Sequence, residues 1–163
     1  MAFYQILLSA LLCPATMLVG TTTANAAQMR SSFQVTSSIP DSCSVTAVGL
    51  DFGAYDGNQN DQTASITVAC TAKGIPYQIG LDNGMHYSAP NRRLKHNATA
   101  SYLIYELYRD AGRSARWGTD DASDVDMTSD GTTQRFTIYG RVPAGQSGPV
   151  GSYSNTTIVT VNF

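Results

Sequence analysis

The sequence predicts an all-β protein in which two β-sheets pack face to face, and three observations support this fold class. Short segments with an apolar residue at every second position recur along the chain. Turn-forming Gly, Asn, Asp and Ser residues separate these segments, and no segment has a convincing helical period. Of the 163 residues, 42% are apolar, and the net charge of −2 gives no electrostatic reason to expect nucleic acid or an anionic membrane as a partner.

The first residues are typical of an export signal. Ile6 to Val19 is largely apolar and is interrupted by Pro14, and Ala24-Asn25-Ala26 follows it. A short apolar stretch before an A-x-A site indicates a secretory signal peptide, although no Lys or Arg precedes the stretch. We therefore expect cleavage after residue 26, which leaves 137 of the 163 residues and no membrane insertion. The alternative, a buried N-terminal helix, leaves the polar, Ala-rich residues after Val19 unexplained.

Two cysteines remain after this cleavage, Cys43 and Cys70. An even pair in an exported chain predicts one disulfide. Closing a loop of about 28 residues in this way stabilises the folded state by about 3–4 kcal/mol, through the unfolded chain. The alternative reading, two ligands of a metal site, lacks partners at metal-ligand spacing.

The segment that follows the signal alternates in polarity. Between Gln28 and Ile39 every even position is polar, whereas Met29, Phe33, Val35 and Ile39 occupy odd positions. This pattern predicts a strand with one apolar edge. Pro40 ends the strand, because proline has no N–H to donate to a β-ladder. We therefore divide the exported chain into a segment of residues 27–41 and a folded body of residues 42–163.

The body contains further alternating segments, in an order typical of a β-sandwich. Tyr102 to Tyr108 is apolar at both parities except Glu106, as expected of a strand that is covered on both faces. Asn58 to Asp61 and Trp117 to Gly131 are expected to be loops. The remaining segments have their apolar residues at one parity: Val48, Leu50 and Phe52; Ile66, Val68 and Cys70; Ile75, Tyr77, Ile79 and Leu81 before the Asp82-Asn83-Gly84 turn; Phe136 and Ile138; and Val159, Val161 and Phe163.

The two ends of the exported chain are unusual when they are considered together. A strand-like segment separated by Pro40 begins it, and a strongly alternating strand ends it at Phe163 with no later strand to cover its edge. An uncovered apolar edge is normally an aggregation hazard. Exported proteins that keep such an edge can use it to accept a strand from a partner.

Catalytic and metal-binding patterns are weak in this sequence, and we expect neither an enzyme nor a cofactor. The acidic run from Asp120 to Asp130 fails the EF-hand pattern, because Ser129 stands where a loop counted from Asp124 needs Gly. The two histidines, His86 and His96, lack nearby metal-ligand partners and are expected at the surface. Trp117 is expected to be a packing residue rather than a sugar platform. Neither a nucleophile elbow nor a phosphate-binding glycine loop is found.

Several short blocks, in a shared order, resemble the spore coat protein U domain family, which includes the subunits of archaic chaperone–usher pili. The resemblance covers nearly the whole exported chain, and the final block is its most specific part. Asn155 stands in that block where an Asp is common. The blocks are Phe33-Gln34-Val35, Cys43-Ser44-Val45, Leu50 to Tyr55, Ile66 to Thr71, Tyr77 to Leu81, Tyr105 to Ala111, Trp117-Gly118, Tyr139-Gly140 and Gly151 to Phe163.

The resemblance implies an immunoglobulin-like β-sandwich that lacks its last strand and is completed by donor-strand exchange. A periplasmic chaperone would lend a strand first, and at the outer-membrane usher the N-terminal segment of the next subunit would replace it. On this chain Met29 to Ile39 would be the donor segment, anchored by Met29, Phe33, Val35 and Ile39. The accepting edge, which the chaperone would also bind, would include Val159, Val161 and Phe163.

The function expected from the resemblance is that of a structural pilus subunit. Such a subunit passes through the periplasm, is displayed at the cell surface, binds identical or related subunits, and supports adhesion or biofilm formation. The alternative is an exported, monomeric domain of the envelope or spore coat that binds without polymerising. In that case residues 29–39 would fold back and close the same molecule, and Pro40 does not forbid this arrangement.

Overall fold

The computed structural model describes residues 29–163, and the chain divides after Ser37 into two units. The proposed signal peptide therefore lies outside the described residues. Residues 29–42 belong to no strand, although their polarity alternates. Of the strand expected from Gln28 to Ile39, the described residues 29–39 form none, because an alternating segment becomes a β-strand only when a neighbour satisfies its backbone groups.

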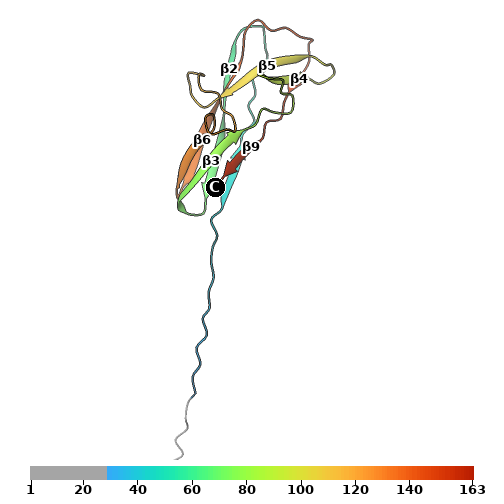
Figure 1. Cartoon of the computed structure of the whole chain (residues 1–163). Helices are drawn as coiled ribbons and strands as arrows, with labels where there is room; N and C mark the ends of the chain where they lie inside the picture. The colour runs from blue at the N-terminus through green and yellow to red at the C-terminus, as the bar shows by residue number, and fades with distance from the viewer. Residues whose placement is uncertain (1–28) are drawn as a thin grey trace, which may run out of the picture. The chain divides into compact units, whose positions relative to one another are not determined.

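The second unit, residues 38–163, consists of nine strands in two sheets (Figure 1). The larger sheet has six strands in the order β1-β2-β7-β5-β4-β8, and the smaller has three in the order β6-β3-β9. Every pairing is antiparallel. The strands are β1 (Cys43–Ala47), β2 (Asn60–Cys70), β3 (Lys73–Leu81), β4 (Arg92–His96), β5 (Tyr102–Tyr108), β6 (Val125–Asp130), β7 (Thr133–Val142), β8 (Tyr153–Ser154) and β9 (Val159–Asn162).

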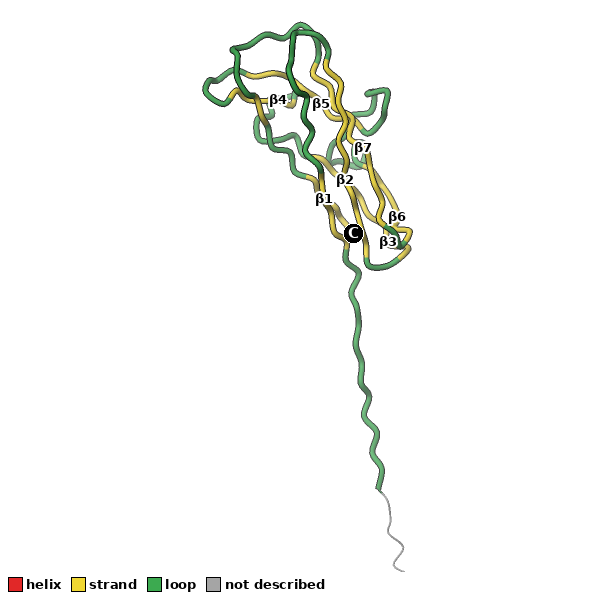
Figure 2. The backbone as a smooth tube through the Cα atoms, turned by 180° about the vertical axis from the view of Figure 1, so that it is seen from behind, coloured by secondary structure: helices red, strands yellow, loops and turns green. Residues whose placement is uncertain are grey.

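The two sheets face each other across a single apolar core. Strands β3, β6 and β9 of the smaller sheet are labelled in Figure 1, and the view from behind in Figure 2 shows β1, β2 and β7 of the larger sheet. Ile66 and Val68 of β2 meet Tyr77 and Ile79 of β3, and all four are at most 2% exposed. The predicted all-β, two-sheet sandwich is confirmed.

Trp117 lies in this core, as expected of a packing residue. Its side chain is 1% exposed, and its indole N–H donates a hydrogen bond of 2.8 Å to the Ile79 carbonyl. The connection after β5 therefore ties into the middle strand of the smaller sheet. A buried indole whose only polar atom is paired contributes apolar area without an unsatisfied donor.

A fully buried arginine lies next to the tryptophan. Arg92 is 0% exposed, and its guanidinium donates to the carbonyls of Leu81, Asp82 and Trp117 at 2.7–3.0 Å. It also forms an ion pair with Glu106 of β5. One side chain thus joins the end of β3, the Trp117 segment and the larger sheet. Since every contact is a charge-assisted hydrogen bond in a dry setting, the cluster fixes the geometry of these elements.

Four expectations about individual elements are corrected by the structure. Residues 125–130, which we expected to be a loop, form edge strand β6, and Asn60 and Asp61 begin β2. Residues 48–52 form no strand, although Leu50 and Phe52 pack on the core. Strand β5 is buried on one face only, since Ile104 is 36% exposed. On the same outer face Arg93 lies over the Tyr102 ring.

Within residues 29–163 no helix is long and apolar enough to cross a lipid bilayer. The described part of the chain contains strands, turns and irregular segments.

Candidate strand-acceptor groove

Two edge strands, one from each sheet, lie next to each other. Strand β1 is at one end of the six-stranded sheet and pairs only with β2, while β9 is at the end of the three-stranded sheet and pairs only with β3. The two strands contact each other without sharing a ladder. In Figure 1 the cyan β1 can be followed beside the red β9. We call this place, between β1 (Cys43–Ala47) and β9 (Val159–Asn162), the open seam.

The backbone of β9 points hydrogen-bonding groups at the open seam. Asp82 N–H donates to the Ile158 carbonyl at 3.1 Å, and Ile158 N–H donates to Asp82 Oδ1 at 2.9 Å. Ile158 therefore faces β3. In an antiparallel ladder alternate residues turn their N–H and C=O groups to opposite edges. Val159 and Val161 consequently direct theirs away from β3, toward the seam.

Strand β1 has the same arrangement. Val48 N–H donates to the Ser65 carbonyl, and Thr71 N–H donates to the Ser42 carbonyl, so even-numbered residues of this segment face β2. By the same alternation the N–H and C=O groups of Cys43, Val45 and Ala47 face the open seam. A strand that entered between β1 and β9 could hydrogen-bond with both edges. Such entry would require the two edges to separate, because they now touch.

Apolar side chains at the open seam are incompletely covered. Val159 and Val161 pack on the core and are only partly buried. Val45 of β1 is 38% exposed, and Val48, which follows β1, is 60% exposed. The core residues of the same sheets are at most 6% exposed. Exposed aliphatic side chains beside unpaired backbone are the combination that strand addition would bury.

A cavity of about 340 Å³ opens at the seam and reaches the core. Ala47, the last residue of β1, and residues 48–50 after it form one wall, and residues 155–157 with Val159 form the other. Leu94, Tyr105, Leu107 and Ile138 of the larger sheet are among the residues that line it. Gly49 leaves space here, since a Cβ added to it would meet no atom within 4 Å. The cavity is therefore large enough, and apolar enough, to take a large side chain.

The wall that precedes β9 is held by polar side chains. Asp82 Oδ1 accepts hydrogen bonds from both Gly84 N–H and Ile158 N–H at 2.9 Å. Asn155 donates from Nδ2 to the Tyr105 hydroxyl at 2.8 Å and accepts from His86 N–H at 3.1 Å. These bonds fix residues 155–158 to the turn after β3 and to β5, so the wall has a defined position without a neighbouring strand.

The predicted disulfide between Cys43 and Cys70 is present and fixes the opposite wall. It joins the first residue of β1 to the last residue of β2, which are also Cα partners in the ladder. Strand β1 has only five residues and a mostly exposed burial pattern. The disulfide therefore retains a short edge strand whose apolar contacts are few.

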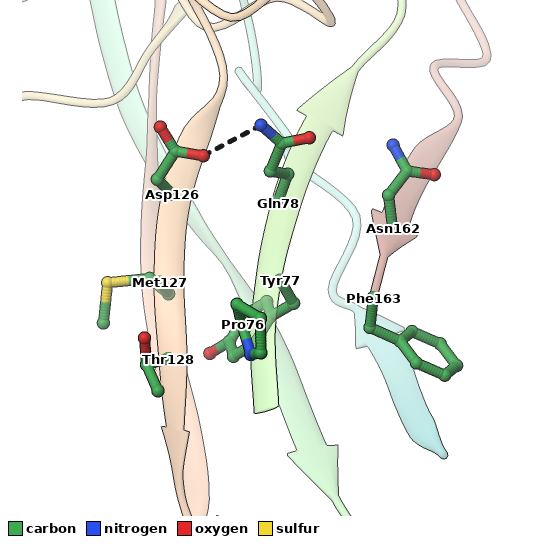
Figure 3. A pocket seen from close by; sticks show the side chains of 8 residues that line it. All are labelled: Pro76, Tyr77, Gln78, Asp126, Met127, Thr128, Asn162 and Phe163. Atoms are coloured by element: carbon green, nitrogen blue, oxygen red, sulfur yellow. Dashed lines mark hydrogen bonds between the residues drawn. The ribbon is translucent and has the colours of Figure 1, made fainter. Parts of the chain in front are cut away.

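The remaining predicted residues are found in different places. Val159 lines the cavity, whereas Phe163 lies at a separate hollow of about 730 Å³ on the three-stranded sheet (Figure 3). Phe163 is 59% exposed. The side chains of the four predicted donor anchors are exposed: Met29 is 99%, Phe33 87%, Val35 81% and Ile39 87% exposed.

One histidine was placed wrongly from the sequence. His96 is not at the surface, because it is 5% exposed and its Nδ1 accepts hydrogen bonds from Ala98 N–H at 3.1 Å and Thr99 N–H at 3.0 Å. The alternation of β4 turns Arg92, Leu94 and His96 inward. This alternation could have indicated from the sequence that His96 is buried. It was hard to recognise, because two of the three inward residues, Arg92 and His96, are polar.

The acidic run between Asp120 and Asp130 forms part of the smaller sheet and of the turn before it. Asp124 is 5% exposed, its Oδ1 has no hydrogen-bond partner, and burial raises its pKa, with the neighbouring Asp126, Asp121 and Asp120 acting in the same direction. Among residues 29–163 no group of three or more His, Cys, Asp or Glu side chains could hold a metal ion.

Two facing sheets with adjacent unpaired edges define a β-sandwich with an open seam. Comparisons with a protein-family model, with a related protein and with solved structures agree with this class. The chain belongs to the Spore Coat Protein U domain family, whose model matches residues 29–160. It is similar to Protein U of Myxococcus xanthus, with 32% identity over 128 residues, which cover 70% of this chain and 71% of Protein U.

The fold is also similar to a solved chain in the CsuC–CsuE chaperone–tip adhesion subunit pre-assembly complex from archaic chaperone-usher Csu pili of Acinetobacter baumannii. The TM-score is 0.61 at 21% identity. The match covers 77% of this chain and 40% of the solved chain. At this identity the likeness concerns the fold alone.

Proposed function

We propose that this chain is a structural subunit of a chaperone–usher surface pilus. It polymerises when residues 29–39 of one copy enter the open seam of the next copy. The single observation that carries the proposal is the open seam itself, where two adjacent strands direct unpaired backbone toward each other beside exposed aliphatic side chains. The subunit has a mechanical role and catalyses no reaction.

The donor segment has the features that such a seam requires. Its odd positions carry Met29, Phe33, Val35 and Ile39, whose side chains are exposed in the structure, and its even positions are polar. A strand with one apolar face buries that face and leaves the other in water. Burying three large anchors contributes about 1.5–3 kcal/mol each, and each new ladder hydrogen bond adds about 1 kcal/mol.

The order of assembly follows from the hazard that an open seam presents. An uncovered apolar edge aggregates, so it needs a temporary cover during transit through the periplasm. The fold neighbour was solved as a chaperone–subunit complex, and we infer that a periplasmic chaperone covers the seam of this chain as well. An outer-membrane usher then allows the next subunit's donor segment to replace the chaperone, and the fibre is displayed at the surface in adhesion or biofilm formation.

Two matched substitutions in the donor segment test the proposal. Phe33→Asp places a charge on the apolar face of the segment, and the control Gln34→Asp places the same charge on its polar face. We expect the exported wild type and Gln34→Asp to run as a ladder of SDS-resistant species that collapses to monomer on boiling. Phe33→Asp should run as monomer without boiling, and its body should still fold.

The same variants separate donation to a neighbour from closure of the same molecule. If residues 29–39 close their own sandwich, Phe33→Asp lowers the melting temperature of a protein that was monomeric before the change. If they donate to a neighbour, a synthetic peptide of residues 27–41 raises the melting temperature of the Phe33→Asp monomer. A wild type that never forms a ladder, and a variant that gains nothing from the peptide, would overturn the proposal.

A further inference from the structure

Among the described residues, the open seam is not the only place where a strand edge lacks a neighbouring strand. Strand β6 is the second edge of the three-stranded sheet, and β8 is the second edge of the six-stranded one. Strand β5 is also uncovered over part of its length, because its pairing with β7 begins only at Glu106. Uncovered edges accept strands from other chains. A linear fibre therefore requires that the edges outside the seam be closed to the donor segment.

The uncovered part of β5 resembles the open seam. Residues 102–104 extend past the end of β7. The Leu107 carbonyl accepts a hydrogen bond from Trp117 N–H, so the even-numbered residues of β5 face the side on which β7 lies. Tyr102 and Ile104 therefore direct their backbone groups to the uncovered edge. Because Ile104 is also 36% exposed, an exposed aliphatic side chain lies beside edge backbone here, as it does at the seam.

This edge lies beside a hollow of about 820 Å³, which is lined by Leu103 and Val142 among other residues. The hollow shares Leu50, Phe52 and Leu94 with the cavity at the open seam. A donor segment that reached the seam would therefore also meet the edge of β5, with an apolar space next to it.

The side chain of Gln146 occupies the edge of β5. Its Oε1 accepts a hydrogen bond from Ile104 N–H at 2.6 Å, and its Nε2 donates to the Ile104 carbonyl at 2.9 Å. A residue of a paired strand would make the same two bonds. Gln146 is itself held in place, since its N–H donates to the Tyr55 hydroxyl at 3.1 Å and that hydroxyl donates to the Pro143 carbonyl at 2.7 Å. The backbone of Ile104 is thus satisfied within the chain, and an incoming strand would gain no new hydrogen bond there.

Side chains also cover the free edge of β6. Even-numbered residues of β3 bond to β9, so its odd-numbered residues bond to their partners on β6, which are odd-numbered too. Thr128 therefore turns its carbonyl to the free edge, where Gln134 Nε2 donates to it at 3.1 Å. Immediately before the strand, Arg109 donates to the carbonyls of Asp124 at 2.5 Å and Ala122 at 3.1 Å. Strand β8 has only two residues, which is too short for a stable ladder.

We propose that Gln146 determines where strand exchange takes place, because it closes the edge of β5 and so confines the donor segment of another copy to the open seam. The seam itself has no such cover. The side-chain hydrogen bonds nearest to it end on the N–H groups of Ser42 and Ile158, which face away from it. This inference rests on the proposed function. Since each body then accepts one donor and supplies one, the fibre grows without branching.

The number of peptides that one chain binds tests this role. Gln146→Met keeps the length of the side chain and removes both hydrogen bonds to Ile104. It is made in the Phe33→Asp chain, whose own donor segment is disabled, and the chain is titrated calorimetrically with the peptide of residues 27–41. The Phe33→Asp parent should bind one peptide per chain, whereas the Gln146→Met variant should bind a second. The control is Gln62→Met, since Gln62 is an exposed glutamine of β2 whose side chain bonds to Asn60 rather than to a strand backbone, and it should bind one.

Hydrogen exchange at the Ile104 amide locates the second peptide. In the free Gln146→Met variant this exchange should be at least about tenfold faster than in the parent, because the amide has lost its acceptor. Saturation with the peptide should slow it again. A purely structural role of Gln146 in the turn after β7 would also accelerate the exchange, but the peptide would not reverse that change.

Melting curves confirm that each variant is folded before it is compared. If Gln146→Met does not fold, Gln146→Ser takes its place, since serine is too short to reach Ile104, and it should give the same result. A single peptide site in the Gln146 variant would overturn the inference and leave the proposed function standing. A second site in Gln62→Met would also overturn it, because loss of any exposed glutamine would then suffice. A parent that binds no peptide would contradict the proposed function, and the inference would fall with it.

Discussion

The region around Arg92 and the open seam differ in how completely their groups are satisfied. Arg92 and Trp117 are at most 1% exposed, and their polar side-chain groups bond to carbonyls or to Glu106. At the open seam Val48 is 60% exposed, and the N–H and C=O groups of Val159 and Val161, which point away from β3, face no partner strand. The comparison teaches that the Arg92 region holds the two sheets together within a single chain. The open seam is therefore not needed for that purpose and can stay open for a partner.

The largest expected effect is at Arg92. Arg92→Ala should lower the free energy of unfolding by about 3–5 kcal/mol, because it leaves Glu106 and three carbonyls without their buried partner. Urea denaturation of the monomer measures this loss. The neighbouring Arg93→Ala is the control, since Arg93 makes one hydrogen bond to the His86 carbonyl and stacks over Tyr102. Equal losses in the two variants would contradict the role that we give to the buried arginine.

The disulfide comes next, and it acts on the open seam. Replacing Cys43 and Cys70 together by Ser should cost about 3–4 kcal/mol, from the entropy of a loop with a separation of 27 residues. The loss should also be local, because the disulfide holds the short strand β1. Hydrogen exchange should accelerate more at Ser44 and Thr46, whose N–H groups face β2, than at Ile79 in the middle of the smaller sheet. Uniform acceleration would show that β1 does not depend on the disulfide.

The fold could be predicted where apolar alternation is strong, and not where polar residues take inward positions. Ile66 with Val68, and Tyr77 with Ile79, predicted β2 and β3 and their place in the core. Strand β4 was missed because two of its inward residues are Arg92 and His96, which become acceptable inside only through partners that other segments supply.

The candidate site was only partly predictable for a related reason. Alternation placed Val159 and Val161 on an uncovered edge strand, and β9 is one. Neither the place of β1 beside β9 nor the cavity at the seam could be inferred, because both depend on how two sheets pack. Edge strand β6 was also missed, since only Val125 and Met127 are apolar in it. Whether residues 29–39 donate to a neighbour stays a prediction.

A substitution at Gly49 tests the open seam with little effect on stability. Gly49→Leu adds a side chain at the wall of the cavity, where a Cβ would meet no atom within 4 Å. We expect the free energy of unfolding to change by less than about 1 kcal/mol. The affinity for a peptide of residues 27–41, measured calorimetrically, should fall at least about tenfold, which corresponds to about 1.4 kcal/mol.

The control for this variant is Thr46→Leu, since Thr46 is also exposed but belongs to the even-numbered residues of β1, which face β2. It should bind the peptide as the wild type does. Unchanged peptide affinity in Gly49→Leu would mean that the peptide binds elsewhere. It would contradict the view that the open seam, unlike the Arg92 region, is kept open for a partner strand.

The smallest effects concern two carboxylates whose pKa values shift in opposite directions. The hydrogen bonds from Arg141 lower the pKa of Asp61, so its ionised form stabilises the fold above the unfolded pKa of about 3.9, and this contribution is lost as the pH falls through the folded pKa. Burial raises the pKa of Asp124, so its protonated form stabilises the fold. This stabilisation is complete below the unfolded pKa and is lost as the pH rises through the folded pKa.

At neutral pH, Asp61→Asn should therefore lower the melting temperature, by an amount worth less than about 1 kcal/mol because the pair is partly exposed. Asp124→Asn should raise it. Both differences from the wild type should shrink as the pH is lowered toward 3. Because neither carboxylate lines the cavity at the open seam, the two differences should be the same with and without the 27–41 peptide. A peptide that changed either one would mean that seam and surface charge are coupled.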